Sequence, residues 1–212
     1  GPIFITQLVG VTTWQNAFLI SALPTFILAL LIMKFIKEEK TEPTEQSGSM
    51  SLGSFLEILK YRNIVLCALV SMFCMSGYWA LLLFGPLYWV NIAGINVQNM
   101  GFVVAATGIL GPIYGLGIPK LSDIYGRKKV LSIFIIFSAL VPLVMYLLPG
   151  SKTSIGVYLL FGAIPGCISP IFFSLIPMET VPEHLKATSA ALSLGAGELV
   201  GGAIFQAIGG SI

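Results

Sequence analysis

The segment LSDIYGRKKV, residues 121–130, is a short charged connection between two long apolar stretches of the chain. Residues 99–121 precede it and residues 130–148 follow it, and each stretch approaches the ~20 apolar residues that a helix needs to cross a bilayer. The connection contains one acid, Asp123, and a basic run at 127–129. This pattern predicts two membrane-spanning helices joined by a turn in water.

The composition of the whole chain also indicates an integral membrane protein. Of its 212 residues, 56% are hydrophobic and only 9% are charged, and the mean hydropathy is +0.94. An ordinary soluble domain carries about 25% charged residues. We therefore expect an all-α membrane bundle with six complete spans and one partial helix, the partial helix being residues 1–11. The complete spans are predicted at residues 14–35, 63–90, 99–121, 130–148, 154–178 and 186–208.

Several classes of function lack support in the sequence. The net charge of +2 is small and the basic residues form no single patch, so no nucleic-acid partner is expected. The single histidine, His184, and three scattered cysteines lack the spacing of a metal site, and no metal or cofactor is expected. No nucleophile arrangement appears within the spans, which argues against an enzyme.

The basic residues are distributed unequally between the two sides of the predicted membrane. Ten of the eleven Lys and Arg residues fall in or beside three connections, at residues 37–60, 121–129 and 179–186, and these connections are two spans apart. Only Lys152 lies on the other side. Because basic loops stay in the cytoplasm, we expect these three loops to be cytoplasmic. The expected location is the plasma membrane, which is the inner membrane in bacteria.

The charged connection resembles the signature loop of the major facilitator superfamily, roughly G-x-L-x-D-R-x-G-R-R/K, which joins the second and third helices of each half. The match is carried by Leu121, Asp123, Gly126, Arg127 and Lys128. The sequence departs at Pro119, where the family has Gly, and at Ile124, where it has a basic residue. The second copy of this loop is commonly the degenerate one, so the departures suit the C-terminal half.

Two further segments resemble landmarks of the same family. GPIFITQL (1–8) and WQNAFLI (14–20) are similar to the end of its fifth helix and the start of its sixth, with Ile5 and Thr6 in place of the two glycines of drug antiporters. VPEHLKAT (181–188) resembles the segment before its eleventh helix. The resemblance implies that residues 1–36 end the N-terminal bundle, 37–60 form the central loop and 61–212 form helices seven to eleven. The first four helices and the twelfth are then absent from an internal fragment.

The resemblance implies a secondary active transporter that moves a small organic solute by alternating access. Its expected partners are the solute, protons, the lipid bilayer and the N-terminal half of the same transporter. Proton-coupled symport is the leading hypothesis. The alternatives are an exporter of drugs or metabolites that works by proton antiport, and a non-transporting membrane sensor built on the same fold.

Glu198 is unusual because it lies within an apolar span, in the segment ALSLGAGELVGGAIF (191–205), whereas the other eight acids lie in cytoplasmic loops or at their helix ends. It follows Lys186 by twelve residues. At 1.5 Å per residue this is about 18 Å, close to the middle of a hydrocarbon core about 30 Å thick. A carboxylate that is neutral when occluded and ionised when hydrated could couple proton flow to solute flow. The alternatives are a structural hydrogen bond between helices and direct contact with a cationic substrate.

The signature loop supplies a second group of candidate residues. Asp123 can pair with Arg127, Gly126 permits a tight turn, and Lys128 adds a further charge. Such a cluster could act as a gate that holds two helices in one state and releases them in another. The alternative is that the basic residues only fix the orientation of the chain.

Candidate substrate contacts lie on three predicted helices. Tyr78 and Trp79 fall at mid-depth of the seventh, Tyr114 lies on the eighth and Ser169 on the tenth. In the family fold the seventh and tenth helices line the central cavity and the eighth is partly exposed to it. The aromatic residues could instead serve packing, and the serine could bond its own backbone.

Overall fold

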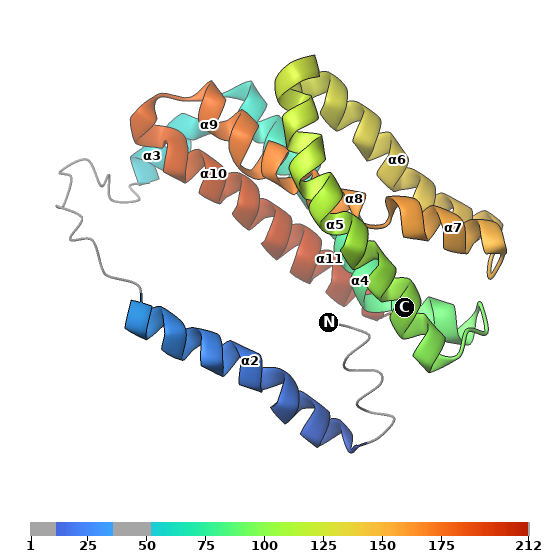
Figure 1. The fold of residues 1–212 in the computed structure, drawn as a ribbon. Coiled ribbons are helices and arrows are strands. Elements are labelled where there is room, and N and C mark those ends of the chain that lie inside the picture. The colour runs from blue at the N-terminus through green and yellow to red at the C-terminus, as the bar shows by residue number, and fades with distance from the viewer. Residues whose placement is uncertain (1–11, 36–51, 212) are drawn as a thin grey trace.

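The computed structural model describes residues 12–35 and 52–211. The predicted partial helix at residues 1–11 and residues 37–51 of the predicted central loop lie outside this description. The described residues are helical with short connections (Figure 1). Helices suit a bilayer because each backbone N–H and C=O group is satisfied within its own segment.

Six described helices are long and apolar enough to cross a membrane, which confirms the prediction of six complete spans. Four of them are continuous: α2 (Trp14–Phe35), α4 (Arg62–Asn91), α5 (Val97–Tyr125) and α6 (Arg127–Leu147). A short helix, α3 (Leu52–Ile58), precedes α4.

The span Lys152–Thr180 is broken into four helical segments. They are α7 (Lys152–Phe161), α8 (Ile164–Cys167), the π-helix η1 (Ile171–Leu175) and α9 (Ile176–Thr180). Pro165 and Pro177 lie at the N-terminal ends of α8 and α9, and Pro170 precedes η1. Proline has no N–H to donate and its ring clashes with the preceding turn, which explains the interruptions.

The span Glu183–Gly210 is also segmented. A 3₁₀ turn, η2 (Glu183–Leu185), leads into α10 (Lys186–Gly195), the π-helix η3 (Ala196–Ile204) and α11 (Phe205–Gly210). This span runs beside α4, and η3 is the part of it that packs most extensively against α4. Helix α2 lies apart from the other helices in Figure 1, and most of its described side chains are exposed.

Three groups of buried side chains lie at different levels of the bundle. The middle group includes Met75, Ile118, Ile168 and Phe172, together with five further residues. A second group joins α3 to the start of α4 and to residues 181–185. A third group surrounds Trp89, which is fully buried. Tyr78, Trp79 and Tyr114 pack against the middle group, so three of the four candidate substrate contacts border the main core.

The predicted loop at residues 121–129 is almost entirely helical, and this expectation is corrected. α5 continues to Tyr125 and α6 begins at Arg127, so Gly126 alone separates them. The backbone of Gly126 has φ of 92°, a value that favours glycine. The helices extend beyond the apolar stretches because the polar side chains at their ends pair with one another. The predicted loop at 179–186 is likewise mostly helical, with residues 181–182 between α9 and η2.

Candidate functional site

Glu198 lies in η3, the π-helical part of the last span. π-Helices are rare, appear mostly as single-turn bulges, and occur frequently at functional sites. This segment is nine residues long, and the Glu198 side chain is neither fully buried nor fully exposed. The wide turn therefore places a carboxylate at mid-span where it can reach the neighbouring helix α4.

Glycines bring η3 into close contact with α4 and η1. A Cβ atom at Gly201 would overlap the Met72 carbonyl oxygen and would lie 2.9 Å from the Ser76 nitrogen, both in the backbone of α4. A Cβ atom at Gly197 would lie 2.9 Å from Cε1 of Phe173. Helix backbones approach this closely in membranes only where the interface residues are small.

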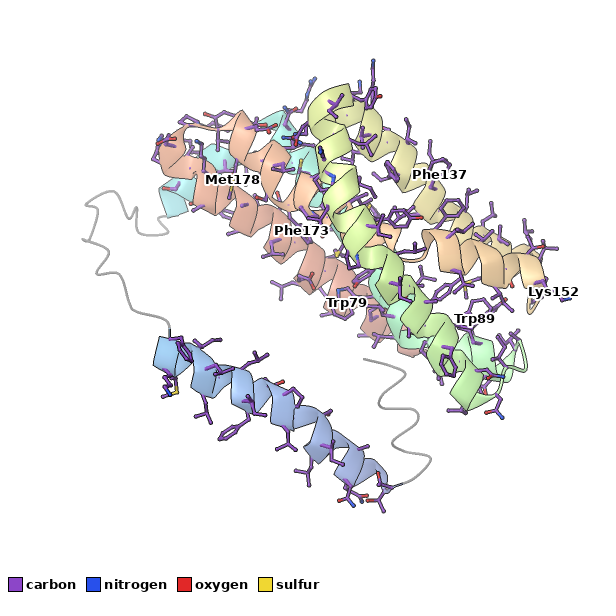
Figure 2. All side chains as sticks on the ribbon, viewed as in Figure 1. Trp79, Trp89, Phe137, Lys152, Phe173 and Met178 are labelled. Carbon is purple, nitrogen blue, oxygen red and sulfur yellow. The ribbon has the colours of Figure 1, made fainter. Side chains whose placement is uncertain are left out.

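Trp79 of α4 donates a hydrogen bond from its indole Nε1 to Oε2 of Glu198 at 3.0 Å. Figure 2 places Trp79 and Phe173 between Met178, toward one end of the bundle, and Lys152, toward the other. The donor and the carboxylate thus meet inside the bundle, on two helices that pack against each other. A polar bond at this depth is stronger than at the surface because little water competes for it.

Tyr78 lies beside Trp79, with ring centroids 5.8 Å apart and an edge-to-face angle of 65°. The Tyr78 ring also contacts α8, because a Cβ atom at Gly166 would lie 3.0 Å from its Cε2 atom. The structure therefore brings three of the predicted residues, Tyr78, Trp79 and Glu198, into one mid-span group.

The other two predicted substrate contacts lie outside this group. Tyr114 of α5 packs against the middle buried group, as Tyr78 does. The Ser169 hydroxyl donates to the carbonyl oxygen of Gly166 at 2.7 Å, within its own span. Ser169 thus makes the local backbone bond that hydroxyl groups in helices often make.

Sequence reasoning missed two further polar links between α4 and the last span. The Ser71 hydroxyl oxygen lies 2.7 Å from the carbonyl oxygen of Ser193. The side-chain amide of Gln206 donates to the carbonyl oxygen of Ser76 at 2.8 Å. Gln206 could have been noticed in the sequence because it is a polar residue within an apolar span, as Glu198 is. On the last span Ser193 and Gln206 lie on either side of Glu198, whereas on α4 both Ser71 and Ser76 precede Trp79.

The charged group at the α5–α6 turn is centred on Arg127. Its guanidinium forms two hydrogen bonds with the Glu179 carboxylate of α9, Nη2 to Oε1 at 2.7 Å and Nε to Oε2 at 3.3 Å. Nη1 donates to the Ser122 hydroxyl at 2.6 Å and forms an ion pair with Asp123. Lys128, the next residue, is exposed.

Glu179 was not among the predicted site residues. It lies at the end of the span Lys152–Thr180, which is far from the turn in sequence but adjacent to it in the fold. Paired hydrogen bonds between arginine and a carboxylate fix orientation as well as supplying energy. The arrangement thereby connects α9 to the turn between α5 and α6 through one side chain.

These features define the class of the protein. Apolar helices cross the membrane repeatedly, a carboxylate lies inside the bundle, and charges gather at one end. Within the part of the chain that is described, no cluster of His, Cys, Asp or Glu is suited to holding a metal ion. The chain is a multi-pass integral membrane protein.

Comparison with known proteins gives the family. The sequence profile of the Major Facilitator Superfamily matches residues 1–206. The chain belongs to this family, whose members are transporters, and the resemblance stated from the signature loop is confirmed. No solved structure matches the chain.

One curated relative is the "Uncharacterized MFS-type transporter YcaD" of Escherichia fergusonii. It is 28% identical to this chain over 128 residues, which is 60% of the chain and 30% of the relative. The match therefore spans less than a third of that relative's length, and the relative's printed name gives no substrate.

Proposed function

We propose that the chain is part of a proton-coupled symporter that moves a small organic solute by alternating access across the plasma membrane, the inner membrane in bacteria. Membership of a transporter family supports the general activity. The observation that carries the coupling is the contact between Trp79 and Glu198, at 3.0 Å, inside the bundle. It identifies a titratable side chain within a transmembrane helix interface.

Glu198 is the proposed proton carrier. A charged side chain in hydrocarbon is expensive, so an occluded and dry state favours the protonated acid. A hydrated state allows the proton to leave. The cycle between these states binds and releases a proton as the two halves of the transporter rock about the central site. From position 187 to 211, Glu198 is the sole residue whose side chain titrates.

The group around Arg127 is the proposed cytoplasmic latch. Its bonds to Glu179 join α9 to the α5–α6 turn. Breaking these bonds lets the two elements separate, and the exposed carboxylates can then be hydrated at little cost. Such a bistable contact suits a transporter that must open and close toward the cytoplasm.

Tyr78 and Tyr114 remain the proposed substrate contacts. Both are partly exposed at the edge of the middle buried group. Trp79 has its N–H bonded to Glu198, which leaves its aromatic faces for a solute or a neighbouring helix. The remaining contacts are proposed to come from the N-terminal half of the transporter, with residues 1–36 closing that half and 61–212 belonging to the C-terminal bundle.

The first test replaces Glu198 in the full-length protein reconstituted in liposomes. Glu198→Gln keeps the shape and a hydrogen-bond acceptor but cannot exchange a proton. We expect uptake driven by an inward proton gradient to fall by about two orders of magnitude, as is typical when a proton-transferring side chain is removed. Exchange of internal for external solute without a gradient should continue. A panel of labelled solutes, measured with and without the gradient, gives both rates.

The matched control is Glu183→Gln, the same chemical change at an exposed position of the same span. It should leave gradient-driven uptake unchanged. If Glu198→Gln behaves like this control, Glu198 is a structural residue and the coupling proposal is wrong. Alkalinisation of the medium on solute addition indicates symport, whereas acidification indicates the antiport alternative, because solute entry then drives protons out.

A further inference from the structure

Gly202 lies against the bonded pair of Trp79 and Glu198. A Cβ atom at this position would be 2.9 Å from Nε1 and 3.0 Å from Cδ1 of the Trp79 indole. It would also be 3.4 Å from Oε2 of Glu198. Two of the three nearest atoms are therefore the donor and the acceptor of the same hydrogen bond.

The indole has little freedom to avoid an added methyl group. It packs against the middle buried group and against the Tyr78 ring, with ring centroids 5.8 Å apart in an edge-to-face arrangement. Tyr78 is in turn confined by α8, where a Cβ atom at Gly166 would lie 3.0 Å from its ring. A side chain at position 202 must therefore displace the indole, the carboxylate or the helix that carries them.

This close contact is not general among the glycines of the last span. Gly195 and Gly210 have no heavy atom within 4 Å of an added Cβ. The three atoms nearest to a Cβ at Gly197 or Gly201 belong to α4 and η1, and none of them to Trp79 or Glu198. Gly202 differs from these glycines because it faces the Trp79–Glu198 hydrogen bond. Gly195, on the same span, provides a matched control.

We propose that Gly202 is a positioning residue that holds the Trp79 indole on the Glu198 carboxylate. This inference rests on the proposed function of Glu198 as the proton carrier. By leaving the space at position 202 empty, Gly202 allows the indole N–H to follow the carboxylate as the latter gains or loses its proton. A larger residue separates the two groups and uncouples the indole from the acid.

Few other titratable groups can obscure this effect. Tyr78 of α4 is a titratable residue that interacts electrostatically with Glu198. Tyr78 also interacts electrostatically with Cys167 of α8. Residues 171–175 of η1 contain none. A pH-dependent signal from Trp79 is assigned to Glu198 by its loss in Glu198→Gln.

The experiment uses the full-length protein with every tryptophan except Trp79 replaced by phenylalanine, in a form that retains uptake. Indole emission is recorded as a function of pH. We expect one transition, and we expect Glu198→Gln to abolish it. If the transition survives in Glu198→Gln, Trp79 does not report on Glu198 and the inference fails, while the coupling proposal is judged separately by the uptake of Glu198→Gln.

Gly202→Ala is then compared with Gly195→Ala in the same background. We expect the amplitude of the transition to fall about fivefold for Gly202→Ala, as for loss of one hydrogen bond. Gly195→Ala should retain the full amplitude. If Glu198→Gln abolishes the transition but Gly202→Ala retains it, the positioning role is wrong while the coupling proposal stands.

A second measurement separates positioning from packing of the helix. Trp79→Phe removes the indole Nε1, which is the atom nearest to Gly202 and the donor to Glu198. If Gly202 acts through the indole, adding Gly202→Ala to Trp79→Phe should not lower gradient-driven uptake further. A further loss of uptake, or failure of the double variant to fold, shows that Gly202 serves helix packing and overturns the inference.

Discussion

Arg127 uses most of its hydrogen-bonding capacity at a single junction. Its planar guanidinium meets the Glu179 carboxylate through two nitrogens and also contacts Ser122 and Asp123. A lysine carries the same charge but has one compact ammonium group, which cannot reproduce a fork of parallel bonds. The geometry, and not the charge alone, therefore connects α9 to the turn.

Arg127→Lys should lower the rate of solute uptake about fivefold, corresponding to about 1 kcal/mol of lost latch energy. The thermal midpoint should change little, because Asp123 and Glu179 are more than half exposed and such ion pairs contribute little to stability. Uptake assays and thermal unfolding in detergent measure the two effects. Lys128→Gln is the control, since its side chain is exposed. If Arg127→Lys keeps full uptake while Lys128→Gln lowers it, only the local charge matters and the proposed role of the guanidinium geometry is wrong.

At the level of single residues, Glu198 and the pair of Asp123 and Arg127 could be singled out from the sequence. The bonds that link Glu198 to Trp79 and Arg127 to Glu179 could not. A lone acid in an apolar span is conspicuous because its burial is costly. Glu179 stands at a helix end, where acids are ordinary, and it is 52 residues from Arg127. The bond from Trp79 to Glu198 joins residues 119 apart, so it depends on how the helices pack.

At the level of elements, the segment η3 shows why the local form of a span is harder to predict than its presence. Hydropathy and length place a helix at residues 186–208, and the structure has a span from Glu183 to Gly210. Nothing in the hydropathy distinguishes an α-helix from a π-helix. The wide turn accompanies the contact that Gly197 and Gly201 make with neighbouring helices, which is a tertiary effect.

Gly201→Ala should weaken the packing of the last span on α4. The added methyl group would meet backbone atoms of Met72 and Ser76, which cannot rotate away as a side chain can. We expect a loss of stability of about 1–3 kcal/mol, the usual cost of overpacking a well-packed interface. Thermal unfolding in detergent measures this loss. Gly195→Ala should cost much less because its Cβ enters open space, and a similar cost at both sites would contradict the proposed contact.

At the level of the whole molecule, the distribution of charge agrees with the arrangement of the helices. Figure 2 shows Lys152 at the end of the bundle opposite to Met178, and Met178 precedes Glu179 of the charged group. Span number and charge asymmetry could be predicted from the sequence because the bilayer imposes them. The ends of α5 and α6 could not be predicted in this way, because the two helices continue into polar residues beyond their apolar parts.

The proposed orientation can be tested by labelling single cysteines in intact cells, in a background from which the native cysteines are removed. Lys152→Cys should react with a membrane-impermeant maleimide added outside. Lys128→Cys should react only after the membrane is permeabilised, because ten of the eleven basic residues are assigned to the cytoplasmic side. The reverse pattern of labelling would show that the chain has the opposite orientation.

The single residue between α5 and α6 has a mechanical consequence. α5 has 29 residues, so it is about 43 Å long at 1.5 Å per residue. A change of about 10° in direction at Gly126 moves the far end of such a rod by about 7 Å. A small rotation at this junction would therefore produce a large movement at the far end of α5, and Arg127 is the residue next to the junction. The displacement at that guanidinium is therefore much smaller than the displacement at the opposite face of the membrane.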